Sequence, residues 1–171
     1  MPDDLPILFL DVDGPIIPFG GHHPPRTTIQ GANPLLSRID PTLGEKLAAL
    51  PVTLVWATTW TSEANDVIAP LLGLPDLPYV DWPDTDTWGE LHWKTAHLVT
   101  WANGRDFIWL DDEPTDLDRR WITRHHPARA LVHQVNPTQG ITDEDLQTVR
   151  SWPARLPGKP RPAAPAPDQP R

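Results

Sequence analysis

The chain has 171 residues, of which 39% are hydrophobic and 22% charged, and it contains no cysteine. This length fits one domain with a buried core and argues against a two-domain enzyme. The absence of cysteine excludes disulfide scaffolds, thiolate zinc sites and cysteine nucleophiles. The net charge of −9 argues against an extended nucleic-acid-binding face.

The two ends of the chain carry simple compositional signals. No apolar run is long enough to span a membrane, and residues 1–4 (MPDD) are acidic where a signal peptide is basic, so we expect a cytoplasmic protein without membrane contact. Six prolines among residues 156–171 predict a disordered Pro-rich tail. The remaining domain, residues 1–155, carries 11 cations and 22 anions.

Short apolar runs alternate with helical patterns along this domain. The apolar runs are too short for helices and lack polar alternation, which predicts strands buried on both faces, at residues 5–10, 52–57, 107–110 and 130–135. The helical patterns carry capping signals such as Asp40-Pro41, Thr142 with Asp145, and Gly104, and they cover residues 40–50, 62–72, 94–103, 116–124 and 142–152. Strands separated by helices predict an α/β fold with a doubly wound parallel sheet.

An acidic pair follows the first predicted strand. Asp11 and Asp13 are two residues apart, so their carboxylates point the same way and repel each other unless a cation lies between them. Gly14 comes directly after them and permits a close approach of the backbone to a ligand. The alternative interpretation is an acidic, solvated loop.

Polar residues also follow the other strands. Thr58 and Thr59 leave the second strand, where a hydroxyl binds a phosphate oxygen or caps the next helix. Lys94 starts a helix, a position that the helix dipole disfavours for a cation. Asp111 and Asp112 end the third strand, and adjacent carboxylates there indicate a divalent cation. Since ligands bind at the carboxyl ends of such strands, we expect these groups to share one site.

The order of these four clusters resembles the motifs of the haloacid dehalogenase (HAD) superfamily of phosphohydrolases. The resemblance rests on DVDG at 11–14, VWATTW at 55–60, Lys94 within HWKTAHL, and WLDDE at 109–113. It spans about residues 5–135. In detail, the ATTWTSEAN, HWK and DDE segments are similar to a small bacterial branch of the superfamily that includes the HAD domains of RNA-repair proteins. The segments between the motifs are too short for the cap domain of many relatives, so the resemblance implies a capless fold with an open site.

The resemblance also implies roles for these residues. Asp11 would be the nucleophile that takes the phosphoryl group, and Asp13 the general acid that protonates the leaving alcohol and then activates water. Thr58, or its neighbour Thr59, would bind the transferring phosphoryl group. Lys94 would offset the negative charge of that group and of Asp11.

The implied metal is Mg²⁺, and its implied ligands are Asp11, Asp13, Asp111 and Asp112. Whether Asp111 or Asp112 contacts the ion directly stays open, and Glu113 and Asp116 are candidates for an outer shell. The chain is thus expected to be a Mg²⁺-dependent phosphomonoesterase acting on a phosphorylated small molecule, a nucleotide or a nucleic-acid end. A phospho-acceptor signalling domain and a non-catalytic phosphate-binding module are the alternatives.

Two loop features have two interpretations each. Residues 20–25 (GGHHPP) predict a flexible flap, in which His22 and His23 either meet substrate or are solvated. Four tryptophans flank the second and third motifs, and they either stack on a nucleobase or pack under a loop: Trp60, Trp82, Trp88 and Trp93. Trp109, in the third predicted strand, is by contrast expected in the core.

Overall fold

The computed structural model describes residues 5–28, 33–84 and 89–152, so the predicted Pro-rich tail and Trp88 lie outside the described residues. Within these ranges, four parallel strands form one sheet in the order β2-β1-β3-β4. The strands are β1 (Ile7–Leu10), β2 (Thr53–Trp56), β3 (Phe107–Asp111) and β4 (Ala130–Gln134). All four match predicted apolar runs, which confirms the parallel α/β fold class. The prediction that every strand is buried on both faces holds for β1 and β3 and is wrong for β2 and β4, which are partly exposed because they form the edges of the sheet.

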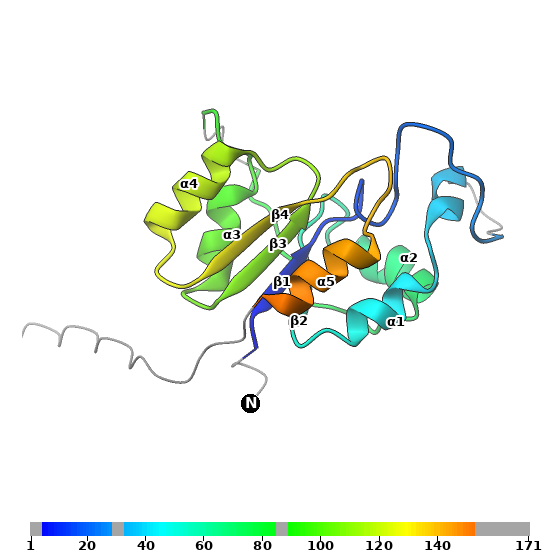
Figure 1. Cartoon of the computed structure of the whole chain (residues 1–171), viewed down its shortest axis with the longest axis horizontal. Helices are drawn as coiled ribbons and strands as arrows, with labels where there is room; N and C mark the ends of the chain where they lie inside the picture. The colour runs from blue at the N-terminus through cyan, green and yellow to red at the C-terminus, as the bar shows by residue number, and fades with distance from the viewer. Residues whose placement is uncertain (1–4, 29–32, 85–88, 153–171) are drawn as a thin grey trace, which may run out of the picture.

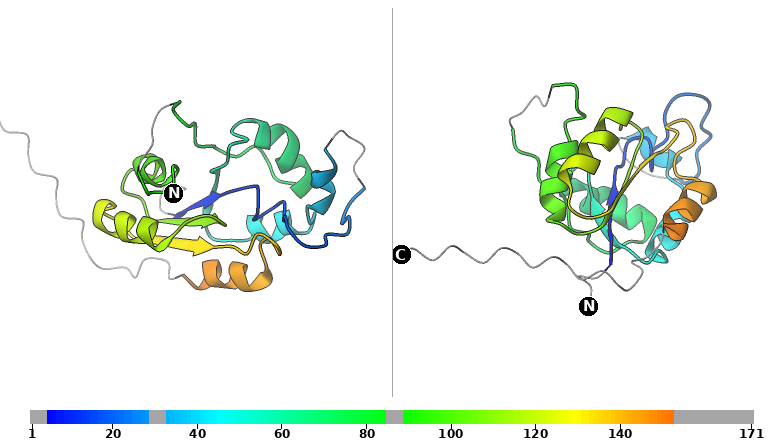
Figure 2. Two further views of the ribbon diagram at one scale, coloured as in Figure 1. Left: turned by 90° about the horizontal axis from the view of Figure 1, so that it is seen from above. Right: turned by 60° about the vertical axis from the view of Figure 1, so that its left-hand side comes forward.

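Side-chain alternation along the strands divides the core into two layers. Leu8 and Leu10 of β1 face one layer, Ile7 and Phe9 face the other, and all four are fully buried. The first layer packs against α1 (Leu43–Ala48), α2 (Glu63–Leu72) and α5 (Asp143–Ser151), and the second against α3 (Thr95–Ala102) and α4 (Asp116–His125). Figures 1 and 2 show the sheet between these two groups of helices.

Side-chain caps set where several elements begin. Thr142 and Asp145 form the predicted capping box of α5. The prediction that a helix starts at Pro41 is wrong, because the Asp40 carboxylate accepts hydrogen bonds from the backbone and hydroxyl of Thr42 and holds residues 40–42 in a turn. The short 3₁₀ helix η2 (Pro34–Arg38), which the sequence analysis did not predict, begins where the Asn33 side chain caps it.

Helix α3 also differs slightly from its prediction. Lys94 is its N-cap residue, and Asn103 ends it in the left-handed conformation at φ 47°, one residue before Gly104. The described part of the chain contains no inserted cap domain, as predicted, so the carboxyl edge of the sheet is not covered by one. Nor does it contain a helix of the length and apolarity needed to cross a membrane.

Candidate active site

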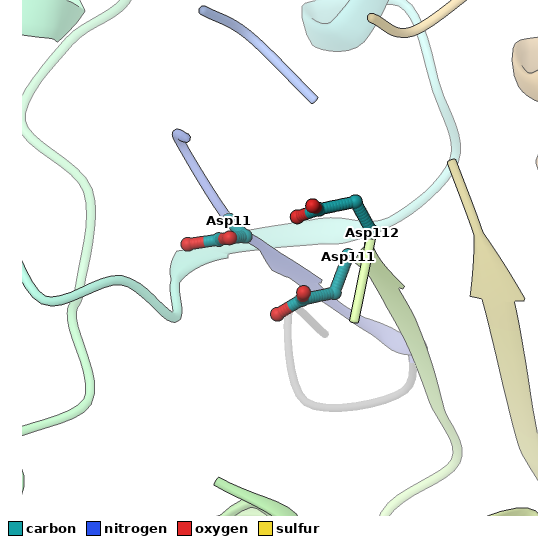
Figure 3. Close-up of side chains that lie close together, drawn as sticks. All are labelled: Asp11, Asp111 and Asp112. Atoms are coloured by element: carbon teal, nitrogen blue, oxygen red, sulfur yellow. The ribbon is translucent and has the colours of Figure 1, made fainter. Parts of the chain in front are cut away.

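The sheet topology brings three carboxylates together at the carboxyl ends of β1 and β3. Asp11 follows β1, Asp111 is the last residue of β3, and the Asp11 amide donates to the Leu110 carbonyl at 3.1 Å. Each of Asp11, Asp111 and Asp112 offers an oxygen, and these atoms lie within 4.8 Å of one another. Figure 3 shows the three side chains pointing to the same side of the sheet edge. We call this group the carboxylate cluster.

Lys94 lies against the cluster and is 3% exposed. Its Nζ atom is 3.0 Å from Asp11 Oδ1 and 2.7 Å from Asp111 Oδ2, so one ammonium group bridges two strand ends. Burial on its own would lower the pKa of Lys94, but the attraction of Asp11 and Asp111 outweighs it and raises the pKa. Lys94 therefore stays protonated beside the proposed nucleophile.

One buried cation does not balance three carboxylates. Burial is the main cause that raises the pKa of Asp11 to about 7, with repulsion from Asp111 adding to it and attraction by Lys94 opposing it. Burial likewise raises the pKa of Asp112 to about 6, with Asp111 adding to the effect. A further cation would favour the ionised carboxylates, and a set of hard oxygen donors fits Mg²⁺ or a similar divalent ion.

Asp111 is fixed by two residues that are close to it in sequence, one in β3 and one just after it. Trp109 Nε1 donates to Asp111 Oδ2 at 3.1 Å, and the Glu113 amide donates to Asp111 Oδ1 at 3.0 Å. Trp109 is fully buried, as predicted, and it also orients a site carboxylate, which the sequence analysis missed. The signal was available, because residues i and i+2 of a strand point to the same face.

Gly14 allows the first and fourth motifs to approach each other. Its φ of 99° is one that side-chain-bearing residues rarely adopt, and a Cβ at this position would lie 2.6 Å from Asp112 Oδ1. The structure thus shows a close approach of Gly14 to the Asp112 carboxylate, and the predicted approach of its backbone to a ligand stays a prediction.

The Asp13 carboxylate is exposed and is not one of the three that form the cluster. It accepts a hydrogen bond from Trp60 Nε1 at 3.0 Å. Trp60 belongs to the second motif, so this bond ties the first motif to the second. The structure thus groups three of the four predicted metal ligands, and both roles assigned to Asp13 stay predictions.

Thr58 and Thr59 differ in burial. Thr58 is fully buried and Thr59 is exposed. The Thr58 hydroxyl accepts from the Trp60 amide at 3.3 Å, so it caps a turn before α2 and leaves its own proton available.

The Trp82 ring makes two contacts near the second and third motifs. Its Nε1 donates to the Thr58 carbonyl at 2.9 Å, and the ring packs edge-on against the Trp93 ring with 4.7 Å between the ring centroids. These contacts favour packing over base stacking for Trp82 and Trp93.

Asp118 holds the segment that carries Lys94. The Asp118 side chain is fully buried. Its Oδ1 atom accepts hydrogen bonds from the His92 amide at 2.8 Å and from the Thr95 hydroxyl at 2.7 Å. Its Oδ2 atom accepts from the amide and the hydroxyl of Thr115, both at 2.8 Å. Burial alone would raise the pKa of Asp118, but these hydrogen bonds hold it below its ordinary value. Because His92 and Thr95 flank Lys94, Asp118 fixes the backbone on both sides of it.

Asp118 also sets the start of α4, which begins at Asp116 as predicted. Thr115 is the N-cap and forms a capping box with Asp118, whereas Asp116, a candidate for an outer shell, pairs with Arg119 at 2.8 Å on the surface. Glu113, the other candidate for an outer shell, accepts from His92 Nε2 at 2.6 Å. The Thr-x-x-Asp spacing was the signal for this cap.

Comparison with protein families finds one that matches most of the chain. The family model described as "HAD domain in Swiss Army Knife RNA repair proteins" matches residues 7–146, a range that includes the whole site. This match confirms the resemblance drawn from the four motifs. Among curated proteins and among solved structures, no match is found.

Proposed function

The chain belongs to the family of HAD domains in Swiss Army Knife RNA repair proteins, and we propose that it is a Mg²⁺-dependent phosphomonoesterase working through an aspartyl-phosphate on Asp11. Family membership supports a phosphohydrolase-type function in general. The observation that carries the finer proposal is the Lys94 ammonium, bonded to both Asp11 and Asp111 within a cluster of three carboxylates.

The residues present fit a divalent cation. Asp11, Asp111 and Asp112 would hold Mg²⁺, which would supply positive charge to the phosphoryl oxygens. Lys94 supplies a permanent positive charge that contacts both Asp11 and Asp111.

In the first step, an oxygen of the Asp11 carboxylate attacks phosphorus, and the bond from phosphorus to the leaving oxygen breaks. Asp13 gives its proton to that oxygen, which leaves as an alcohol. The hydrogen bond from Trp60 Nε1 supports this role, because it holds the Asp13 carboxylate in place two residues after Asp11. The free proton of the Thr58 hydroxyl is suited to bind a phosphoryl oxygen.

In the second step, Asp13 takes a proton from water as the water oxygen attacks phosphorus. The bond between phosphorus and Asp11 then breaks, inorganic phosphate leaves, and the Asp11 carboxylate is restored. An acid–base residue two positions after the nucleophile favours turnover over a persistent phosphorylated state, and hence an enzyme over a phospho-acceptor signalling domain. The sheet edge without a cap domain suits a substrate with a large leaving group, such as a nucleotide or a nucleic-acid end.

A phosphatase assay tests the proposal. Wild-type protein is expected to hydrolyse p-nitrophenyl phosphate with Mg²⁺ and to lose this activity in excess chelator. Asp11→Asn should lower kcat by several orders of magnitude, because an amide does not attack phosphorus. Asp66→Asn, an exposed substitution on α2, is the matched control and should keep full activity. Activity that persists in Asp11→Asn protein, or in chelator, would overturn the proposal.

A further inference from the structure

A polar cavity lies outside the carboxylate cluster. Its volume is about 350 Å³, and it lies between the loop after β1 and the loop after β4. One wall is basic and the other carries hydroxyl and amide groups; the side chains that matter here are His22, His23, Arg26, Arg38, Thr138 and Gln139.

The walls of the cavity begin at the catalytic edge of the sheet. The loop after β1 starts with the Asp11–Gly14 turn, and its Pro15 carbonyl accepts from the Ile141 amide at 2.8 Å. Further along, the Phe19 amide donates to the Pro137 carbonyl at 2.8 Å. These bonds attach the loop after β4 to the segment that follows the proposed nucleophile, so the cavity is built onto the active-site loop.

The charge of this cavity is opposite to that of the chain as a whole. The chain carries −9, yet the described residues that line the cavity include two arginines and no aspartate or glutamate. Arg38 is half-buried and is held by a hydrogen bond from Nη1 to the Pro18 carbonyl at 3.1 Å. Arg26 has a long, exposed contact of 3.4 Å with Asp40, which neutralises it only weakly.

The donors of the cavity are suited to a phosphate group. A guanidinium has five N–H donors in a planar fork that matches two phosphate oxygens. The described side-chain hydrogen bonds of Arg26 and Arg38 each use only Nη1. Gln139 adds an amide from the opposite wall, whereas the Thr138 hydroxyl already donates its proton to Asn136 Oδ1 at 2.8 Å. A volume of about 350 Å³ is in the range of small-ligand sites, which accommodates a phosphate with part of its sugar.

We propose that this cavity binds a second phosphate group of the substrate, while the scissile phosphomonoester lies at Asp11. The inference rests on the proposed phosphatase function and adds a substrate class to it, namely molecules with two separated phosphates. The second phosphate belongs either to the phosphodiester backbone of an oligonucleotide or to a nucleoside bisphosphate, and the two have the same chemistry at the cavity.

The kinetic test compares specificity between substrates. It measures kcat/KM for a terminally phosphorylated dinucleotide and for a nucleoside 3′,5′-bisphosphate, each divided by kcat/KM for p-nitrophenyl phosphate. Arg26→Gln and Arg38→Gln should each lower at least one of these ratios by about 10-fold or more, since a charged hydrogen bond to phosphate is lost. The ratio that falls identifies the source of the second phosphate. Arg150→Gln, at the far end of α5, is the matched control and should change neither ratio.

A binding measurement separates this inference from the proposed function. Calorimetry with a dinucleoside monophosphate, which has a phosphodiester but no scissile phosphomonoester, and with the bisphosphate reports on the cavity even if the protein hydrolyses nothing. The inference predicts a Kd at least about 10-fold higher in Arg26→Gln for one of the two probes. Ratios and Kd values unchanged in both arginine variants would overturn the cavity as a phosphate site, whether or not the protein is a phosphatase.

Discussion

The two threonines that bond Asp118 offer a matched pair of substitutions. Thr95→Val removes one hydrogen bond to Oδ1, and Thr115→Val removes one hydrogen bond to Oδ2. Each oxygen keeps its second, backbone donor, and each substitution replaces a hydroxyl by a methyl group of similar size. Only Thr95 is adjacent to Lys94, so the pair separates the positioning of Lys94 from the stability of the Asp118 site.

The expected energies follow from the two environments. Thr95 is fully buried and its hydroxyl is 2.7 Å from a carboxylate oxygen, so losing this bond should lower the free energy of unfolding by about 1.5–3 kcal/mol. Thr115 is an exposed N-cap, and its loss should cost about 1 kcal/mol. In Thr95→Val a small displacement of Lys94 Nζ from Asp11 should lower kcat by about 10- to 100-fold. In Thr115→Val kcat should change by less than about 3-fold, because α4 does not carry Lys94.

The assay is steady-state hydrolysis of p-nitrophenyl phosphate at saturating Mg²⁺, with urea unfolding of the same samples. Thr95→Ser is the conservative control, since it restores the hydroxyl and should recover most of kcat. If both valine variants lose kcat in proportion to their loss of stability, or if Thr95→Ser does not restore it, Asp118 stabilises the fold without positioning Lys94.

Three further results are expected. Gly14→Ala places a Cβ atom 2.6 Å from Asp112 Oδ1, so the Asp112 carboxylate must move. A Mg²⁺ titration of activity should then show an apparent affinity for Mg²⁺ that is at least about 10-fold weaker. An unchanged affinity for Mg²⁺ would contradict the close approach. Trp60→Phe removes the indole N–H that donates to Asp13. It should lower the rate of hydrolysis of substrates with poor leaving groups by about 3- to 10-fold and have little effect on p-nitrophenyl phosphate. Equal effects on both kinds of substrate would refute a positioning role for Trp60. Asp145→Asn should lower the free energy of unfolding by about 1 kcal/mol near neutral pH. Burial tends to raise the pKa of Asp145, but its hydrogen bonds lower the pKa overall, so the wild-type advantage is present above the unfolded pKa. Calorimetric scans should show this advantage disappear as the pH falls through the lowered folded-state pKa.

The sheet was predictable mainly because its two central strands, β1 and β3, are short and almost entirely apolar runs. Ile7–Leu10 and Phe107–Asp111 are buried along their whole length, and such runs have few alternatives to a central parallel strand. The carboxylate cluster was predictable for a related reason, since the carboxyl ends of adjacent parallel strands meet at one edge. Asp11, Asp111 and Asp112 therefore converge as expected.

Other parts of the site depend on contacts that no local pattern encodes. The bond from Trp60 to Asp13 joins residues 47 positions apart, and the bond from Thr95 to Asp118 joins residues 23 positions apart. The basic cavity combines loops from opposite ends of the chain. By contrast, the Trp109 bond to Asp111 and the Thr115 cap follow local rules, and the sequence contained enough information to predict both.

The central claim is that Asp11 carries the phosphoryl group during turnover. The most direct measurement is mass spectrometry of acid-quenched Asp13→Asn protein after mixing with p-nitrophenyl phosphate and Mg²⁺. This substrate needs little protonation of its leaving group, whereas hydrolysis of the intermediate needs the missing base, so the phosphorylated enzyme should accumulate. We expect the added phosphate on the peptide that contains Asp11, and none in the Asp11→Asn, Asp13→Asn double variant. Rapid product release with no labelled Asp11, or a label on another residue, would contradict the account.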